Sequence, residues 1–355
     1  MTPRLGFVGL GWIGAMRLEA VAAAGLAEVA ALCESAPQRL EETCKAYPGA
    51  VGFQNLDEML ERSGDLELDG MVIATPNSLH APQALAALDR GLAVFCQKPL
   101  ALNAREAREM VEAARRADRL LGVDYSYRFT EGARELRRAM AAGELGRVFS
   151  VDTVFHNAYG PDKPWCFDPR LAGGGALMDL GVHLIDLALW LLGDPGVEAV
   201  HGGAWRGGEP LTGGVDDFAS ARIELEGGAS VSVAVSWNAH AGRDCVIRLA
   251  VFGTGGGAEF RNVDGSFYDF ELARFSGRSE EVTVRESRDW LGKAILDWAG
   301  RLGNGERFDP AIGRSVRVSE VVDAIYRRDL TPCPPLPSPA RPTPGEGGRM
   351  PADVP

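Results

Sequence analysis

The 355-residue chain has few cysteines, no excess of positive charge and no long apolar run. Its six cysteines are scattered without a C-x-x-C pair, so we expect reduced thiols in a cytoplasmic protein and neither a disulfide framework nor a metal site. The net charge of −12 argues against a nucleic-acid partner. No apolar run approaches the roughly 18 residues that span a membrane. The first predicted strand begins by Leu5, which leaves no space for a secretory signal.

A glycine-rich turn lies near the start of the chain. Gly9, Gly11 and Gly14 form G-x-G-x-x-G between a predicted strand at residues 5–8 and a predicted helix at 15–24. The first glycine permits a tight turn, the second leaves space for a pyrophosphate, and the third lets the helix pack closely on its strand. The helix N-terminus offers N–H groups to the phosphates. The turn therefore predicts dinucleotide binding, with a purely structural turn as the alternative.

A carboxylate follows at a suitable distance. Glu34 ends the next apolar run, residues 28–33, about 20 residues past the last glycine, where a carboxylate accepts from the adenosine ribose 2′-OH. The same charge repels a 2′-phosphate. No arginine stands directly beside Glu34, and the nearest, Arg39, lies on the following predicted helix. The sequence therefore predicts NAD rather than NADP as cofactor.

The pattern of predicted helices and strands changes about a third of the way along the chain. Residues 1–122 alternate helices with apolar strands at 5–8, 28–33, 69–75, 93–96 and 120–125, which predicts a Rossmann domain with a doubly wound parallel sheet covered on both faces. Residues 123–330 form a second domain with β-branched or alternating runs, separated by glycine-rich turns, at 148–155, 218–225, 230–237, 245–252 and 266–273, which predicts a largely antiparallel sheet. Residues 331–355 alternate proline with small polar residues, and we expect a disordered tail.

One lysine is well placed for chemistry. Lys98 directly follows a predicted strand at 93–96, and ligands of open α/β sheets bind outside the carboxyl ends of the strands. Lys98 can therefore reach a substrate bound near the cofactor. A surface lysine beside a turn is the alternative.

A second signal lies in a predicted helix at residues 173–192. Asp179 and His183 stand at i, i+4 on one face, where the carboxylate can orient the imidazole and stabilise its charged form. The glycines at 173–175 allow close approach of another surface, such as a bound nicotinamide. A structural Asp–His pair is the alternative. A catalytic zinc needs three protein ligands, and no obvious third is supplied nearby.

Together these residues resemble the Gfo/Idh/MocA oxidoreductases. The resemblance covers roughly residues 4–328 and rests on GFVGLGWIG at 6–14, ATPNSLH at 74–80, CQKPL at 96–100, YRF at 127–129 and GGGALMDLGVHLIDLALWLLG at 173–193. It implies a Rossmann domain followed by an α/β domain whose open sheet builds homodimers or homotetramers. It also implies a catalytic set that falls on Lys98, Asp179 and His183.

The resemblance also suggests contacts. We expect the cofactor to touch Gly9, Gly11, Trp12, Ile13, Glu34, Thr75, Pro76, Asn77, His80, Gln97 and Lys98. We expect the substrate to touch Lys98, Asp179 and His183. The residues themselves offer further candidate contacts, for which core aromatics, a helix-capping amide and a solvated arginine are the alternatives: Tyr125, Arg128, His156, Asn157, Trp165 and Asn238.

The chain departs from the family at one position. The family usually has Glu-Lys-Pro, and this chain has Gln97-Lys98-Pro99. An amide removes a charge that would favour the ammonium form of a neighbouring lysine. We therefore expect Lys98 to lose its proton more readily, unless residue 97 points away from the site.

Three functions fit these features. The leading hypothesis is a nicotinamide-dependent dehydrogenase that acts on a ring secondary alcohol or ketone of a sugar, cyclitol or amino sugar. A redox-assisted glycosidase or lyase with retained NAD is the second hypothesis. The third is a dinucleotide-sensing regulator, which would have no need of Lys98, Asp179 and His183 together.

Overall fold

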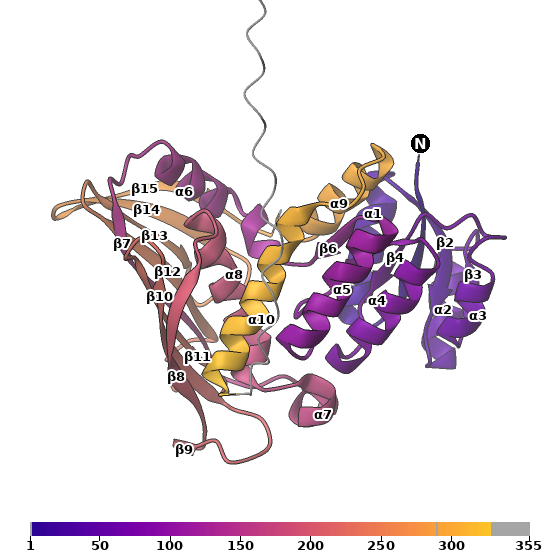
Figure 1. Cartoon of the computed structure of the whole chain (residues 1–355), viewed down its shortest axis with the longest axis horizontal. Helices are drawn as coiled ribbons and strands as arrows, with labels where there is room; N and C mark the ends of the chain where they lie inside the picture. The colour runs from indigo at the N-terminus through magenta and orange to yellow at the C-terminus, as the bar shows by residue number, and fades with distance from the viewer. Residues whose placement is uncertain (1, 289, 328–355) are drawn as a thin grey trace, which may run out of the picture.

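The computed structural model describes residues 2–288 and 290–327 of the chain. The expected tail at 331–355, and Cys333 within it, lie outside the described residues. Two β-sheets stand apart with helices between and around them (Figure 1). The five described cysteines form no disulfide.

The first sheet has six parallel strands in the order β3-β2-β1-β4-β5-β6, which confirms the Rossmann prediction. Every strand but β3 was expected from its apolar run; β3 has only three residues and one buried side chain, too little for a sequence signal. The strands are β1 (Arg4–Val8), β2 (Glu28–Cys33), β3 (Val51–Phe53), β4 (Gly70–Ile73), β5 (Ala93–Cys96) and β6 (Leu121–Val123).

The helices of this sheet follow local signals. Pro37 occupies the first turn of α2, and the side chains of Asn55 and Asn103 accept from backbone N–H groups at the starts of α3 and α5. Asn77 begins η1, and its side chain donates to the carbonyl oxygen of Ala172, 95 residues away. The helices are α1 (Trp12–Ala24), α2 (Pro37–Ala46), α3 (Leu56–Glu61), the 3₁₀ turn η1 (Asn77–Leu79), α4 (His80–Asp89) and α5 (Ala104–Ala117).

The second sheet has nine strands in the order β15-β14-β13-β12-β7-β11-β10-β8-β9. Its neighbours are antiparallel except for β7 and β11, so the largely antiparallel prediction is confirmed. A strand expected at 266–273 begins four residues later, and β8, β9, β13 and β15 were not expected. The strands are β7 (Val148–Asn157), β8 (Val197–Arg206), β9 (Glu209–Pro210), β10 (Phe218–Leu225), β11 (Ser230–Ser236), β12 (Cys245–Gly253), β13 (Gly257–Asn262), β14 (Phe270–Ser276) and β15 (Ser279–Glu286).

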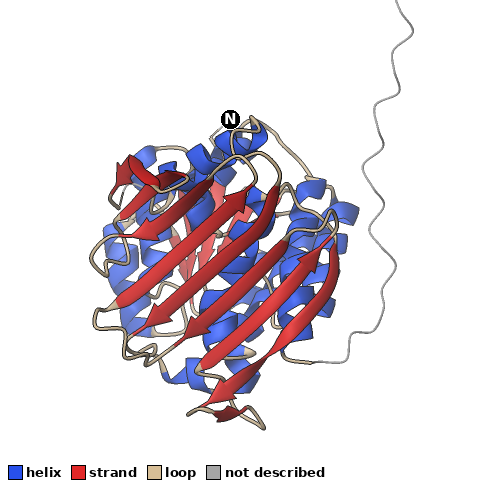
Figure 2. Ribbon diagram, turned by 90° about the vertical axis from the view of Figure 1, so that its left-hand side faces the viewer, coloured by secondary structure: helices blue, strands red, loops and turns tan. Residues whose placement is uncertain are grey.

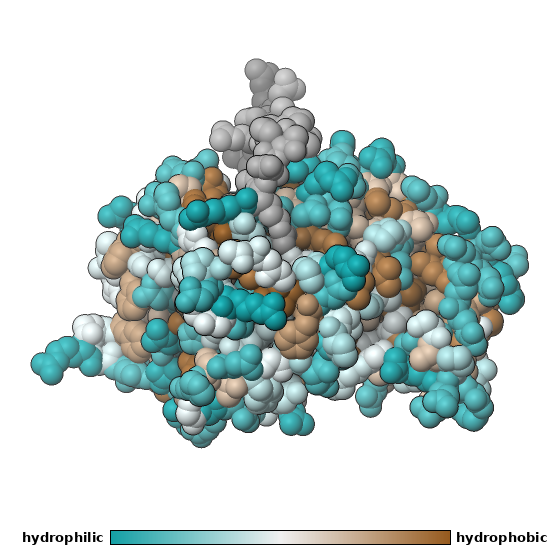
Figure 3. Space-filling view, turned by 90° about the horizontal axis from the view of Figure 1, so that it is seen from below, coloured by the Kyte–Doolittle hydropathy of each residue, from teal (hydrophilic) through white to brown (hydrophobic). Residues whose placement is uncertain are grey.

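Helices cover one face of this sheet. Helices α6 (Glu131–Ala141), α8 (Val182–Leu191) and α10 (Gly313–Ile325) lie between it and the first sheet (Figure 1). The opposite face, turned toward the viewer in Figure 2, shows strands without a covering helix. Seen from below, the surface is mainly hydrophilic, with smaller apolar groups between (Figure 3).

The chain returns to the first sheet near its end. Helix α9 (Lys293–Gly303) packs on α1. Its Trp298 is buried in the core of the first sheet, with its ring centroid 5.7 Å from that of Phe95. The two sheets are therefore joined by packing as well as by the chain.

The helix expected at 173–192 forms, but it starts about three residues later and contains a π-helical segment, η4 (Leu177–Gly181), that runs directly into α8. A separate short helix, α7 (Pro169–Ala172), precedes it. Residues Pro169–Leu191 are together long and apolar enough to cross a membrane, and 89% of their most apolar window is buried in the protein. The expectation that no run approaches that length was therefore wrong, and the stretch forms the centre of the second domain's core.

The glycines at 174 and 175 are required by the packing of the fold. A Cβ on Gly175 would stand 1.8 Å from the carbonyl oxygen of Asp216, and one on Gly174 would stand 2.2 Å from the Tyr326 hydroxyl. The Asp216 carboxylate accepts from the N–H groups of Gly175 and Leu177 at 2.7 and 2.8 Å. A buried side chain thus supplies the acceptors for the backbone that enters η4.

Replacing Asp216 should therefore destabilise the protein. Asp216→Ala removes the acceptor of the buried Leu177 N–H and the nearer of the two acceptors of the Gly175 N–H, and we expect a loss of roughly 3 kcal/mol in the free energy of unfolding. The matched control is Asp217→Ala, whose carboxylate accepts one exposed N–H from Gly207, and whose loss should stay below about 1 kcal/mol. Urea unfolding measures both, and equal losses would contradict the role of Asp216.

Candidate active site

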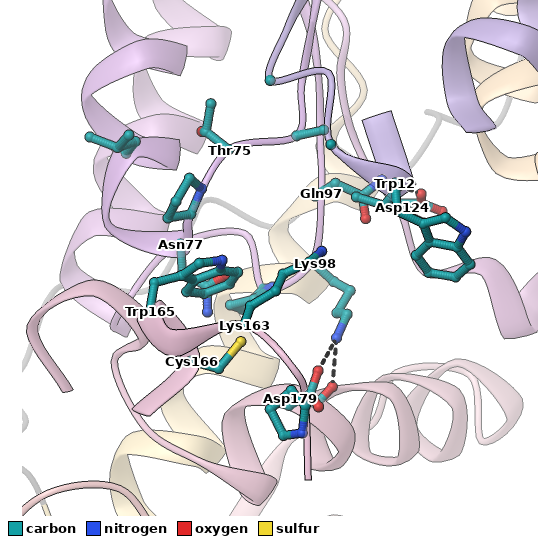
Figure 4. Close-up of a pocket in the computed structure, with 18 of the residues that line it drawn as sticks. Trp12, Thr75, Asn77, Gln97, Lys98, Asp124, Lys163, Trp165, Cys166 and Asp179 are labelled. Carbon is teal, nitrogen blue, oxygen red and sulfur yellow. Dashed lines mark hydrogen bonds and ion pairs between the residues drawn. The ribbon is translucent and has the colours of Figure 1, made fainter. Parts of the chain in front are cut away.

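A cavity of about 980 Å³ lies at the carboxyl ends of the first sheet's strands. Its walls come from the first domain, from the segment at residues 161–166, from η4 and from Phe267, Tyr268, Trp290 and Leu291. Figure 4 shows side chains from both domains converging in this space. Most of the expected cofactor contacts line it: Gly9, Gly11, Trp12, Ile13, Glu34, Thr75, Pro76, Asn77, Gln97 and Lys98.

The glycine turn has the geometry that a dinucleotide requires. Gly9 has φ +84°, and a Cβ there would lie 2.6 Å from the carbonyl oxygen of Ala74. A Cβ on Gly14 would lie 2.0 Å from the carbonyl oxygen of Gly9. Helix α1 can therefore pack this closely on the turn only because residue 14 is glycine. Gly11 has no heavy atom within 4 Å of its Cβ position. Helix α1 then begins without a side-chain cap, which leaves its first N–H groups to a phosphate.

Glu34 lies in the cavity wall just after β2. Its carboxylate accepts from the N–H groups of Leu10 at 2.9 Å and Ala36 at 3.0 Å. Arg39 lies 3.3 Å from the same carboxylate. No arginine is adjacent to Glu34 in the sequence, but the fold brings Arg39 next to it. Burial raises the pKa of Glu34, but the two N–H groups and the Arg39 guanidinium outweigh burial and hold the pKa below its usual value.

His80 has a different environment from the other expected cofactor contacts. Its side chain is fully buried, with one ring nitrogen 2.8 Å from the carbonyl oxygen of Pro99 and the other 2.9 Å from that of Thr75. His80 thus connects the turn after β4 with the turn after β5 through these two hydrogen bonds, and it does not line the cavity.

Lys98 and Asp179 meet across the two domains. The Nζ of Lys98 donates to Oδ1 of Asp179 at 2.7 Å and to its carbonyl oxygen at 2.8 Å (Figure 4). The other carboxylate oxygen accepts from Nε1 of Trp237 at 3.2 Å. A lysine ammonium has three N–H donors, so one remains for a ligand in the cavity. Asp179 positions this lysine, and Trp237 positions Asp179.

The expected effect of Asp179 on His183 was wrong. Asp179 pairs with Lys98 and Trp237, and it lies on the π-helical segment η4, whereas His183 lies on α8. Burial lowers the pKa of His183 well below its usual value, and the cations of Lys98 and Arg17 lower it further. His183 therefore presents a neutral imidazole to the cavity that it lines.

Gln97 faces a carboxylate rather than Lys98. Its Nε2 donates to Asp124, which also forms a buried ion pair with Arg17 at 2.5 Å. Ser126 completes the cluster by donating to Asp124 at 2.6 Å. The Gln97 amide thus has its own buried partner, and the Lys98 ammonium has another.

Several expected substrate contacts lie elsewhere. Arg128 forms a buried pair with Asp186 and lies over the Tyr125 ring, and neither Arg128 nor Tyr125 lines the cavity. His156 lies 2.9 Å from the Ser236 hydroxyl. Of the further candidates, Asn157 buries its Oδ1 without a partner among the described residues, and Asn238 accepts from the N–H of Gly160. Trp165 does line the cavity.

The cavity also contains residues that sequence reasoning missed. Tyr127 lines it, and its ring lies edge-on to that of His183, with centroids 5.0 Å apart. Tyr127 and Asp124 follow a strand end, the same signal that singled out Lys98. Other missed residues come from segments with no such signal, among them Lys163, Cys166, Trp237 and Trp290.

This cavity lies where a Rossmann sheet receives a dinucleotide, and a lysine from that sheet meets an aspartate of the second domain inside it. Such an arrangement defines a class, the two-domain dinucleotide-dependent oxidoreductases. Within that class, the chain belongs to the Gfo/Idh/MocA family, and it is an oxidoreductase whose Rossmann domain binds a nicotinamide dinucleotide.

Comparison with known proteins gives this assignment its detail. Residues 3–125 match the oxidoreductase family with an NAD-binding Rossmann fold, and residues 133–259 match the GFO/IDH/MocA C-terminal domain. The chain is 31% identical to the rhizopine catabolism protein MocA of Rhizobium meliloti, over 73% of this chain and 78% of that protein. It is 38% identical to the 1,5-anhydro-D-fructose reductase of Ensifer adhaerens, over 44% of this chain and about half (47%) of that protein.

Solved structures share the fold. Aldose-aldose oxidoreductase from Caulobacter crescentus superposes with a TM-score of 0.80 at 23% identity, covering 92% of this chain and 97% of that chain. Other structures with this fold are complexes with NAD, NADH or NADP.

A charge at position 97 should destabilise the buried cluster. Gln97→Glu places a second carboxylate against Asp124, and like charges raise the pKa of one of them. The introduced carboxyl group then has a folded-state pKa above its unfolded value, so the variant is penalised at neutral pH and recovers as the pH falls. The penalty at pH 8 is about 1.4 kcal/mol for each unit by which that pKa rises.

Melting temperatures at pH 8 and pH 5 measure this effect. Gln97→Met is the control, because it removes the same hydrogen bond without adding charge, and its loss should not depend on pH. Adding Asp124→Asn to Gln97→Glu restores one carboxylate and one amide and should recover part of the stability. A deficit in Gln97→Glu that is the same at both pH values would contradict the like-charge argument.

Proposed function

We propose that this protein is a nicotinamide-dependent dehydrogenase that oxidises a ring secondary alcohol, or reduces the corresponding ketone, of a sugar, cyclitol or amino sugar. The observation that supports this most directly is the Lys98–Asp179 pair, which leaves one lysine N–H free in a cavity beside the dinucleotide site. Relatives are named as acting on levoglucosan, inositol and glucosides, which supports the substrate class.

The proposed roles follow from the contacts. Lys98 donates its remaining N–H to the substrate oxygen and stabilises the negative charge that develops there. His183, neutral at physiological pH, accepts the hydroxyl proton during oxidation and returns it during reduction. Asp179 and Trp237 hold the lysine in place. A bound nicotinamide dinucleotide, held by the glycine turn, Glu34 and the strand ends, would accept or supply the hydride.

The decisive experiment follows the absorbance of reduced nicotinamide with the purified protein, NAD and a panel of cyclitols, sugars and amino sugars. Net formation of NADH supports a dehydrogenase. Product without net change in cofactor would favour a redox-assisted glycosidase or lyase instead.

Single substitutions should separate chemistry from binding. We expect Lys98→Ala and His183→Ala to lower the rate of turnover by roughly 10²–10⁴ and to leave NAD affinity nearly unchanged. His156→Ala is the matched control, because this histidine lies outside the cavity, and it should retain most activity. A Lys98 or His183 variant with near wild-type turnover would exclude that residue from the proposed role.

We also propose NAD over NADP, because Glu34 repels a 2′-phosphate. Arg39 limits this preference, since its half-exposed side chain can leave Glu34 and meet a phosphate. Glu34→Gln should therefore lower the ratio of the NADP dissociation constant to the NAD dissociation constant by roughly tenfold. Arg39→Ala should raise this ratio. Fluorescence titration with both cofactors measures the ratios, and tighter NADP binding by the wild type would refute this proposal.

Two expectations about the protein as a whole stay predictions. The homodimer or homotetramer implied by the resemblance fits the uncovered face of the nine-stranded sheet (Figure 2). The cytoplasmic location is the other.

A further inference from the structure

One buried arginine in the cavity wall lacks a partner for part of its side chain. Arg17 lies on α1, one turn after Gly14, with only 4% of its side chain exposed. Its Nε donates to Asp124 at 2.5 Å and its Nη2 to the Ser126 hydroxyl at 3.2 Å. Its Nη1 is buried and has no acceptor among the described residues. A buried donor without an acceptor is unfavourable, so this atom calls for an acceptor that residues 2–288 and 290–327 do not supply.

Gln97 leaves a complementary group unused. Its Nε2 donates to Asp124, and an amide oxygen would not face a carboxylate, so this contact orients the side chain. The opposite atom, Oε1, accepts no hydrogen bond from the described part of the chain. Gln97 is 5% exposed and lines the same cavity as Arg17. One wall therefore offers an unused donor and an unused acceptor.

The position of this wall identifies the part of a dinucleotide that reaches it. Glu34 follows β2, whereas Gln97 and Asp124 follow β5 and β6, on the other side of β1 and β4 in the sheet. An adenosine at Glu34 and a pyrophosphate at the glycine turn place the nicotinamide end near Gln97. Lys98 is the next residue, so the wall also adjoins the proposed reaction centre.

The charge of the cluster favours a neutral ligand group. Arg17 is paired with Asp124 at 2.5 Å, so the two charges compensate each other. An anionic group would find no net positive charge there. A primary carboxamide is neutral, and it carries one carbonyl acceptor and one NH₂ donor, which complement the Arg17 donor and the Gln97 acceptor.

We propose that Arg17 and Gln97 bind the carboxamide of the nicotinamide ring. Nη1 of Arg17 donates to the carboxamide oxygen, and Oε1 of Gln97 accepts from its NH₂ group. Asp124 acts as a positioning residue, because it holds both side chains in the required orientation. The inference rests on the proposed function, since it requires a nicotinamide dinucleotide in the cavity.

The test compares two ligands that share the adenosine and differ at the nicotinamide. NAD and ADP-ribose are titrated by isothermal calorimetry against the wild type, Arg17→Lys and Gln97→Met. Each variant loses one hydrogen bond to the carboxamide, so its NAD affinity should fall by roughly threefold to tenfold, while its affinity for ADP-ribose stays unchanged. Arg39→Met is the matched control at the adenosine end, and it should change both affinities by the same factor.

A ligand change provides the same test without any substitution. The 3-acetylpyridine analogue of NAD keeps the carbonyl oxygen and replaces NH₂ by a methyl group, so the wild type should bind it more weakly than NAD. In Gln97→Met this difference should disappear. Equal affinities of the wild type for the two dinucleotides, or equal losses for NAD and ADP-ribose in the variants, would overturn the inference. Failure of the wild type to bind ADP-ribose would instead overturn the proposed function.

Discussion

The contact between Lys98 and Asp179 is the interaction on which the site depends. It joins the end of a strand in the first sheet to the core segment of the second domain, 81 residues later. Because Nζ of Lys98 donates to both the carboxylate and the carbonyl oxygen of Asp179, the lysine has one direction left for a ligand. The relative placement of the two domains therefore sets the direction in which the remaining N–H of Lys98 points.

The structure around Asp179 maintains this contact. Asp216 satisfies the backbone N–H groups where the chain enters η4, and the missing side chains of the glycines there let that backbone approach Asp216. Trp237 donates to the remaining carboxylate oxygen. The π-helical segment is common at functional sites, and here it changes the relation between Asp179 and His183, so the two residues act separately instead of as a pair.

The predictable part of the site followed local rules. The turn at Gly9, Gly11 and Gly14, the carboxylate of Glu34 and the strand-end position of Lys98 all depend on residues close in sequence, and the structure places them in one cavity. Predictions that a particular side chain contacts a ligand were less successful where they rested on its position in one helix or strand. Arg128 is paired in the core with Asp186, because a buried arginine needs a carboxylate and this one lies 58 residues away. His80 likewise supports two turns instead of a ligand.

The sequence by itself determined the fold class and the dinucleotide turn, because strand and helix periodicity and glycine spacing are local properties of the chain. Together with the family resemblance, it also singled out Lys98, Asp179 and His183. Only the tertiary structure decided which of these groups pair. Asp179 meets Lys98 and not His183, Gln97 meets Asp124, and Arg17 keeps one buried donor free. These partners lie 27 to 107 residues apart, and only the packing of two sheets against each other brings them within hydrogen-bonding distance.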